Sequence, residues 1–228
     1  MRIAVCLSGQ PRKFEIGFHY LSAALQDHEV DYYAHLWGGS LGDPLLIYSA
    51  KQVAVGDYIQ EDTEKQFLQL YGPKAHKFEE QIDFVDNDLI HNHGRNSVTN
   101  QPPSVFLSML YSRMKAFDLV DGSYDAIIST RTDFCPIVPI GQIDLDLISF
   151  AYVGGPEWGH THINDVFAVG NYKNMLVYTD LYNHYRQIYE SGIDFCAHRI
   201  SMQHLKNNKV PVGTIFGTNW KLARINDV

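Results

Sequence analysis

Ile3-Ala-Val-Cys-Leu7 is an almost wholly apolar run, and Ser8-Gly9-Gln10-Pro11 ends it at once. Such a run is typical of a parallel strand that is covered on both faces, and the glycine and proline indicate a turn. The next apolar residues recur at spacings of four, three and four, as on one stripe of a helix: Phe14, Phe18, Leu21 and Leu25. Residues 30–37 then predict a second strand. This strand, helix, strand order predicts a parallel pair within an α/β fold.

The middle of the chain repeats the alternation of helix and strand. Residues 104–119 predict a helix with Ser104 as its N-cap, and residues 124–130 predict a central strand that ends at Arg131-Thr132-Asp133. Further helices are expected at residues 61–71, 174–189 and 195–206, and further strands at residues 77–84, 149–153 and 210–216. Residues 87–103, rich in Asn, His, Gly, Ser and Pro, predict a long loop, either a binding loop or lid or a disordered segment.

The length of 228 residues suits one α/β domain that buries a sizeable core without disulfides. The three cysteines, Cys6, Cys135 and Cys196, lie far apart beside apolar neighbours and form no CxxC motif. We therefore expect buried thiols in a reducing compartment rather than a redox or zinc site.

The balance of charge is acidic, with 18 Lys and Arg against 26 Asp and Glu and a net charge of −8. This disfavours sequence-independent binding of nucleic acid, although a few arginines and backbone amides suffice for a small anion. The first apolar run is too short for a signal peptide, and no stretch approaches the roughly 20 apolar residues that span a bilayer. We therefore expect no membrane span and a cytoplasmic location.

Polar residues that follow buried parallel strands are the first candidates for a site, because ligands bind at the carboxyl ends of such strands. The turn with Ser8, Gly9 and Arg12 lets the backbone approach a ligand and adds a positive charge for an anion. The alternative is a tight turn with a solvated arginine. The turn matches neither the P-loop nor the dinucleotide fingerprint.

Two further candidates lie later in the chain. In Arg131-Thr132-Asp133, the carboxylate is suited to hold a divalent cation while the arginine faces a diphosphate; the alternative is an ion pair that closes the end of the strand. Asn164 and Asp165 precede an apolar segment and are suited to bind sugar hydroxyls, with Asp165 as a general base; the alternative is an Asx turn or N-cap. His160 and His162 offer a less favoured metal cluster with Asp165.

Five segments, taken in order, resemble a poorly characterised group of bacterial and viral glycosyltransferase-like proteins. They are Arg2-Ile-Ala-Val-Cys-Leu-Ser-Gly-Gln-Pro-Arg12, Val30-Asp-Tyr-Tyr-Ala-His-Leu-Trp37, Ser108-Met-Leu-Tyr-Ser112, Tyr124-Asp-Ala-Ile-Ile-Ser-Thr-Arg-Thr-Asp133 and Ile163-Asn-Asp-Val-Phe-Ala168. The resemblance extends over most of the chain. It implies a nucleotide-sugar-dependent glycosyltransferase of the GT-A type, with a Rossmann-type, mostly parallel central sheet flanked by helices. Within a single domain, residues 1–135 are expected to bind the donor and residues 136–228 the acceptor.

The resemblance also implies residue roles. Asp133 matches the last aspartate of an Asp-x-Asp metal motif, but Arg131 replaces the first, which puts the implied cation, Mn²⁺ or Mg²⁺, in question. His204 is the candidate second metal ligand. Asn164 and Asp165 match the acceptor-binding or catalytic position. The donor-binding residues that it implies are Ser8, Gly9, Arg12, Ser108, Tyr111, Ser112 and Lys115.

The expected reaction is transfer of a hexose from a nucleoside diphosphate sugar, with UDP as the favoured nucleotide, to a hydroxyl of a glycan or other acceptor. Arg131 would stabilise the diphosphate that leaves, and Asp165 would act as the base if the enzyme inverts configuration. One alternative is a sulfo- or nucleotidyltransferase, in which the same arginines would bind the sulfate or phosphate of a different activated donor. The other is a degenerate, transferase-like protein that binds carbohydrate without turnover.

Overall fold

The computed structural model describes residues 1–48, 53–85, 102–152 and 163–223. Its centre is a seven-stranded sheet of order β10-β8-β9-β6-β1-β2-β5. The strands are β1 (Arg2–Gly9), β2 (Glu29–Gly38), β5 (Ala75–Glu80), β6 (Ala126–Thr130), β8 (Ile148–Ala151), β9 (Phe167–Gly170) and β10 (Val212–Ile215). All neighbouring pairs are parallel except those of β9, which runs antiparallel to β6 and β8. The predicted α/β class with a mostly parallel sheet is confirmed.

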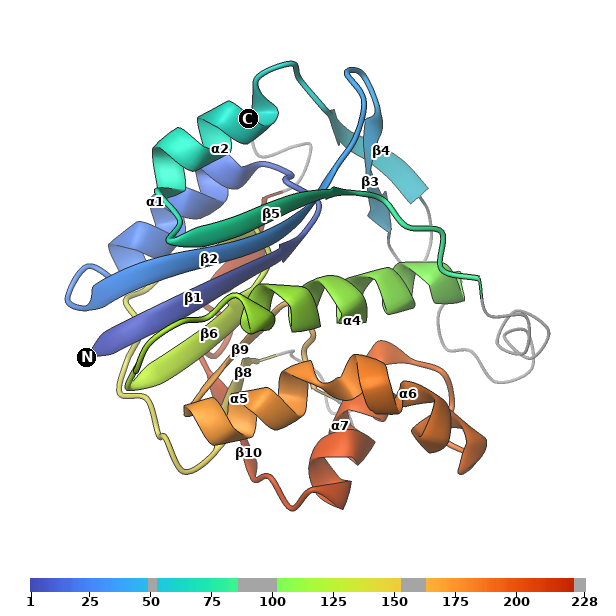
Figure 1. The fold of residues 1–228 in the computed structure, drawn as a ribbon. Coiled ribbons are helices and arrows are strands. Elements are labelled where there is room, and N and C mark those ends of the chain that lie inside the picture. The colour runs from blue at the N-terminus through green and yellow to red at the C-terminus, as the bar shows by residue number, and fades with distance from the viewer. Residues whose placement is uncertain (49–52, 86–101, 153–162, 224–228) are drawn as a thin grey trace.

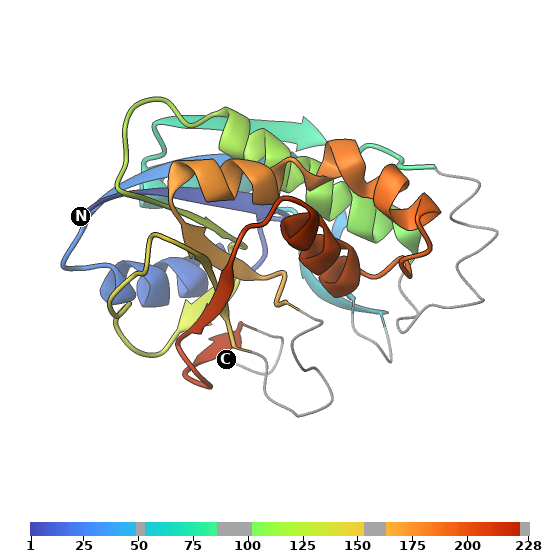
Figure 2. The same cartoon turned by 90° about the horizontal axis from the view of Figure 1, so that it is seen from below.

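Helices cover both faces of the sheet (Figures 1 and 2). The helices α1 (Phe14–Ala24) and α2 (Thr63–Tyr71) lie on one face, and α4 (Pro103–Asp118), α5 (Tyr172–Thr179), α6 (Leu181–Glu190) and α7 (Ala197–Asn207) lie on the other. Alternate residues of β1 supply the two cores: Val5 and Leu7 pack in the cluster of α1, and Ala4 and Cys6 in the cluster that contains the end of α4. Burial on both faces explains why β1 is continuously apolar.

Two small sheets lie beside the main one. A hairpin joins β3 (Pro44–Tyr48) to β4 (Val53–Tyr58), and β7 (Phe134–Pro136) pairs antiparallel with β11 (Trp220–Leu222). The sequence did not predict these strands or β9. Strands from both predicted halves share the main sheet, where β6 pairs with β9, while the division of donor and acceptor binding between the halves stays a prediction.

Three details of the sequence-based prediction are wrong. The helix expected at residues 174–189 is two helices, α5 and α6, because Asp180 is both the C-cap of the first and the N-cap of the second. Ser104 is not the N-cap of α4; Pro102 is, and Pro103 occupies the first helical position, where its missing N–H costs nothing. The strand expected at residues 77–84 is β5, which ends at Glu80.

One further expectation is confirmed. The three cysteines are free and buried, as predicted. None of the described helices combines the length and the apolar character needed to cross a membrane. Most of the expected loop at residues 87–103, including His91 and His93, lies outside the described residues, as do His160 and His162.

Candidate functional site

A pocket of about 680 Å³ lies at the carboxyl ends of β1, β2 and β6. The turn after β1 and the residues from Ser129 to Arg131 line one part, and the first turns of α4 and α7 line another. Asp165, from the segment before β9, also lines it. The structure therefore brings together the ends of three strands that are distant in sequence, at the edge where open α/β sheets bind ligands.

The turn after β1 is held by helix α4. Gly9 has φ of 99°, a conformation that favours glycine, and its N–H donates to Oγ of Ser112 at 2.8 Å. Ser8, Gly9 and Arg12 all line the pocket, as the prediction requires. The Gly9 N–H already has an acceptor within the protein. A ligand would therefore contact the exposed side of this turn rather than the Gly9 N–H.

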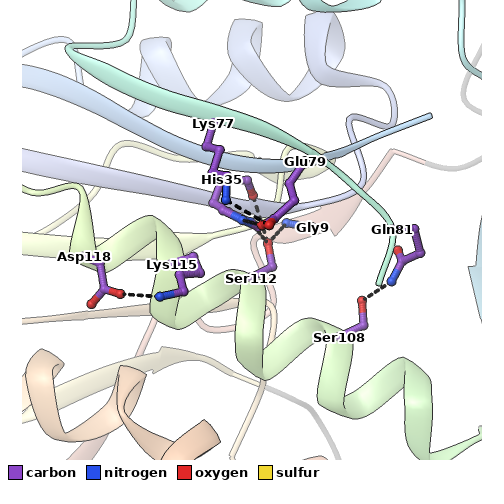
Figure 3. Close-up of polar contacts among 9 residues, drawn as sticks. All are labelled: Gly9, His35, Lys77, Glu79, Gln81, Ser108, Ser112, Lys115 and Asp118. Carbon is purple, nitrogen blue, oxygen red and sulfur yellow. Dashed lines mark hydrogen bonds and ion pairs between the residues drawn. The ribbon is translucent and has the colours of Figure 1, made fainter. Parts of the chain in front are cut away.

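Ser112 is a positioning residue rather than a ligand contact in this structure. It is completely buried, and its hydroxyl donates to the His35 carbonyl at 2.9 Å and lies 3.0 Å from His35 Nδ1 (Figure 3). His35 Nε2 lies 2.7 Å from Glu79 Oε2, so the contacts run from the β1 turn through α4 and β2 to β5. Burial, the largest effect, lowers the pKa of His35, and the hydrogen bond to Glu79 opposes this.

Two of the other predicted donor contacts on α4, Ser108 and Lys115, point in different directions (Figure 3). Ser108 lines the pocket and accepts a hydrogen bond from Gln81 at 3.1 Å. Tyr111 stacks on the ring of Trp37 with centroids 5.8 Å apart, inside an aromatic cluster. Lys115 pairs with Asp118 at 3.3 Å, one turn beyond Ser112. Of the four residues from α4, only Ser108 lines the pocket.

Arg131 and Asp133 form the ion pair that was the alternative interpretation of this triplet. Arg131 Nε donates to Asp133 Oδ1 at 2.8 Å and Nη2 to Oδ2 at 2.6 Å, while Arg12 Nε lies 4.0 Å from Oδ2. Asp133 is 1% exposed, whereas Arg131 lines the pocket. Burial disfavours the charge of Arg131, but Asp133 and Asp165 outweigh it and raise the pKa of Arg131. The two arginines thus surround one buried carboxylate.

Thr132 ties this triplet to the turn after β1. Its Oγ1 lies 3.0 Å from the carbonyl oxygens of both Gln10 and Arg12. Helix α1 packs so closely that a Cβ added to Gly17 would lie 1.8 Å from the Thr132 carbonyl oxygen. A glycine on α1 is therefore required for the two polar turns to meet.

Asn164 and Asp165 have different roles. Asn164 is 4% exposed, and its Oδ1 accepts from the Val166 N–H at 2.8 Å, which is the Asx turn that was the alternative interpretation. Asp165 lines the pocket, and its backbone carbonyl accepts from Arg113 Nη2 at 2.9 Å. The Asx turn positions the Asp165 side chain at the pocket.

Arg113 was missed by the sequence analysis. It lines the pocket from α4, is 3% exposed, and lies over the Tyr178 ring at 4.4 Å from its centroid. A signal was available, because Arg113 falls on the same helical face as the buried Phe106, Leu110 and Phe117. An arginine within an apolar stripe has to be compensated by something in the fold or in a ligand.

The residues predicted to hold a metal ion do not fit that task here. Both oxygens of Asp133 accept hydrogen bonds from Arg131. Nε2 of His204, which does not line the pocket, lies 2.9 Å from the carbonyl of Val177, and burial, the largest effect, lowers the pKa of His204. No group of three or more His, Cys, Asp or Glu side chains suited to a metal ion occurs within the described part of the chain. The requirement for Mn²⁺ or Mg²⁺ stays a prediction.

No protein-family model matches the chain, and no curated protein matches its sequence. Solved structures do resemble its fold. The galactosyltransferase LgtC, in complex with donor and acceptor sugar analogs, is 12% identical with a TM-score of 0.48, covering 94% of this chain and 73% of LgtC. The glycosyltransferase GlyE of Streptococcus pneumoniae TIGR4, in its apo form, is 10% identical with a TM-score of 0.43, covering 92% of this chain and 44% of GlyE. At these TM-scores the similarities assign no residue role in this chain.

Proposed function

We propose that this chain is a glycosyltransferase that moves a hexose from a nucleoside diphosphate sugar, with UDP as the preferred nucleotide, to a hydroxyl of a glycan or other acceptor. The observation that carries the proposal is the pocket at the carboxyl ends of β1 and β6, which Arg12, Arg131 and the carboxylate Asp165 all line. Cations for a leaving diphosphate and a carboxylate for an acceptor hydroxyl are the two groups that this reaction needs.

The leaving diphosphate would be stabilised by the arginines. Arg12 and Arg131 approach one carboxylate, Asp133, so these three groups together carry a net positive charge. Because Asp133 holds Arg131 through two hydrogen bonds, the guanidinium is oriented before the donor binds. Oriented charges of this kind stabilise a transition state without reorganisation at the moment of reaction.

Asp165 would act on the acceptor side. In an inverting reaction its carboxylate takes the proton from the attacking hydroxyl, and in a retaining reaction it steadies the bound sugar instead. Arg113 supports either role, because it holds the Asp165 backbone carbonyl at 2.9 Å. The divalent cation implied by the sequence resemblance is kept as a prediction for experiment, and no step above passes through it.

The first experiment is a thermal-shift screen with UDP-, GDP-, CMP- and dTDP-sugars, each with Mn²⁺ and with EDTA. A ligand that binds the folded state raises the melting temperature, so one nucleotide class is expected to stand out. Arg12→Gln should reduce that shift, whereas the matched Arg186→Gln, on an exposed side chain of α6, should keep it. An absence of shift with every donor would falsify the proposal and favour another activated donor, such as that of a sulfotransferase.

A second candidate function is carbohydrate binding without turnover. The observation that favours it is the Arg131–Asp133 pair, which occupies the carboxylate expected to hold a cation. Incubation of the stabilising donor with a panel of glycans, followed by chromatography of the nucleotide, separates the two functions. Release of the nucleoside diphosphate that Asp165→Asn abolishes supports the transferase, and binding without release supports the second candidate.

A further inference from the structure

Arg113 differs from the other arginines in the described part of the chain. Five of them have a carboxylate within 4.0 Å: Arg2, Arg12, Arg131, Arg186 and Arg199. Arg113 forms no ion pair with a described residue, although it is 3% exposed and therefore among the most buried cations of the protein. A buried charge without a counter-ion is costly, and functional sites are where such charges persist.

The contacts of Arg113 leave part of its guanidinium unused. Nη2 donates to the Asp165 carbonyl at 2.9 Å, and the Tyr178 ring lies beneath the group. Nη1 is buried and has no hydrogen-bond partner. The ring and the carbonyl lower the cost of burial, but neither supplies the two acceptors that the Nη1 hydrogens require.

A second unpartnered donor belongs to Asn164, the residue before Asp165. Asn164 is 4% exposed, and its Oδ1 accepts from Val166, yet its Nδ2 has no partner. Asn164 and Arg113 thus flank Asp165, one by sequence and one by its hydrogen bond to the Asp165 carbonyl. Two unsatisfied buried donors beside a pocket carboxylate indicate a place for an acceptor-rich group of the ligand.

Arg113 comes to the pocket from a different element than the two arginines assigned to the diphosphate. Arg12 and Arg131 converge on Asp133 in the turns after β1 and β6, whereas Arg113 reaches the pocket from α4 at Asp165. Asp165 is the residue placed at the sugar, so the unpaired charge lies on the sugar side of the site.

We propose that Arg113 binds a carboxylate of the substrate, so that the sugar held next to Asp165 is an acidic one, such as a hexuronate. This rests on the proposed glycosyltransferase function and specifies its substrate class. A carboxylate offers two oxygens to the guanidinium and the charge that the buried cation lacks. Since Nη1 is itself covered, the guanidinium turns toward the pocket when the carboxylate enters.

The test compares ligands that differ by a single carboxylate. Calorimetry on the full chain measures the Kd of UDP, UDP-glucose and UDP-glucuronate, and then of glucose and glucuronate added to the UDP complex. The first set places the acid on the donor and the second places it on the acceptor. In one of the two sets the acidic sugar is expected to bind about tenfold more tightly than its neutral counterpart.

Arg113→Met should abolish this preference and leave the affinity for UDP alone within about twofold. Arg186→Met, the same substitution on an exposed arginine of α6, should change neither value. If Arg113→Met does not fold, Arg113→Lys is the substitute, because lysine keeps the charge but lacks the planar guanidinium. Arg113→Lys should retain a reduced preference for the acidic sugar. The comparison of acidic and neutral sugars on the unmodified protein tests the proposal without any variant.

The outcomes separate the two proposals. Binding of UDP with equal affinity for acidic and neutral sugars in both sets overturns the role of Arg113 and leaves the transferase intact. A loss of affinity for UDP itself in Arg113→Met, equal to the loss for UDP-glucuronate, shows that Arg113 binds the diphosphate and also overturns the proposal. No binding of any of the five ligands overturns the role of Arg113 and the choice of UDP as the nucleotide.

Discussion

A carboxylate that accepts hydrogen bonds from cationic side chains lies near each end of strand β1. The two carboxylates differ in their exposure to solvent. At the amino end, Asp31 accepts from Arg2 Nη2 at 3.1 Å, Lys74 Nζ at 2.7 Å and Tyr124 OH at 2.9 Å, and its side chain is 15% exposed. At the carboxyl end, Asp133 is 1% exposed and is held by Arg131.

The difference separates a cluster that fastens neighbouring elements from a cluster that lies at the pocket. The partners of Asp31 come from three separate segments, and the arginine and lysine are more than a third exposed, so the cluster fastens the ends of neighbouring elements. The partner of Asp133 comes from two residues away and lines the pocket. Exposed ion pairs contribute little to stability, whereas removal of one member of a buried pair strongly destabilises the protein.

The largest expected effect follows from removing the buried charge at the carboxyl end. Asp133→Asn leaves Arg131 without its bidentate partner, and we expect the free energy of unfolding to fall by about 3–5 kcal/mol. Urea denaturation followed by tryptophan fluorescence measures this. A loss below about 1 kcal/mol, the range of exposed pairs, would place Asp133 in the same class as Asp31 and remove the contrast.

The next effect concerns the packing of α1 on the site. Gly17→Ala would normally stabilise a helix, but its Cβ would lie 1.8 Å from the Thr132 carbonyl oxygen, so we expect a loss of about 2 kcal/mol and weaker donor binding. The matched control is Gly141→Ala, where an added Cβ meets nothing within 4 Å. Thermal unfolding of both variants checks the prediction, and similar melting temperatures would contradict it.

A smaller effect is expected from the network beneath the β1 turn. Ser112→Ala leaves the Gly9 N–H without its acceptor, and we expect a loss of about 1–2 kcal/mol. Because Gly9 lines the pocket, KM for the donor should rise while kcat changes less. The control is Ser22→Ala on α1, which removes an exposed hydrogen bond from the Ser22 hydroxyl to the His19 carbonyl. An unchanged KM would limit Ser112 to a structural role.

The smallest effect is expected at the amino end. Asp31→Asn should lower the free energy of unfolding by about 1 kcal/mol. This loss should become smaller as the salt concentration rises, and donor binding should not change. Burial, the largest single effect, would raise the pKa of Asp31, but hydrogen bonds led by that from Lys74 outweigh it, and the pKa is lowered.

The sign of the pH dependence follows from this direction. A carboxylate with a lowered pKa in the folded state stabilises the protein above its unfolded pKa of about 3.9, and that stability is lost as the pH falls through the folded value. The difference between the unmodified protein and Asp31→Asn should therefore shrink when urea denaturation is repeated from pH 5 down to pH 3. A difference that is constant over this range would show that Asp31 is not held ionised by its partners.

Local pattern was enough to predict most elements of the sheet. The apolar run of β1 and the stripe on α1 carry their own signal, because burial on two faces or on one face sets the period of apolar residues. The strands β7 and β11 were missed because each has only three residues, too few to show a period. The break at Asp180 was missed because the apolar pattern continues across it.

The candidate site was predicted in part. Ser8, Arg12 and Arg131 were expected at the ends of strands and Asp165 before an apolar segment, and all four line the pocket. The resemblance implied that Ser112 and Lys115 bind the donor together with Ser108, but successive residues of a helix are turned by 100°, which directs these side chains to different surroundings. The roles of all these residues in catalysis stay predictions.

The sequence by itself determined the α/β class, the first strand with its turn, and the triplet at the end of the central strand, because each depends on neighbours a few residues away. Only the tertiary structure decided which polar groups are satisfied by the protein. Asp133 is held by Arg131, Ser112 holds Gly9, and Arg113 keeps unpaired hydrogens at the pocket. The contact of Ser112 with Gly9 and the unpaired hydrogens of Arg113 depend on distances between elements remote in sequence, and composition and periodicity carry no information about those distances.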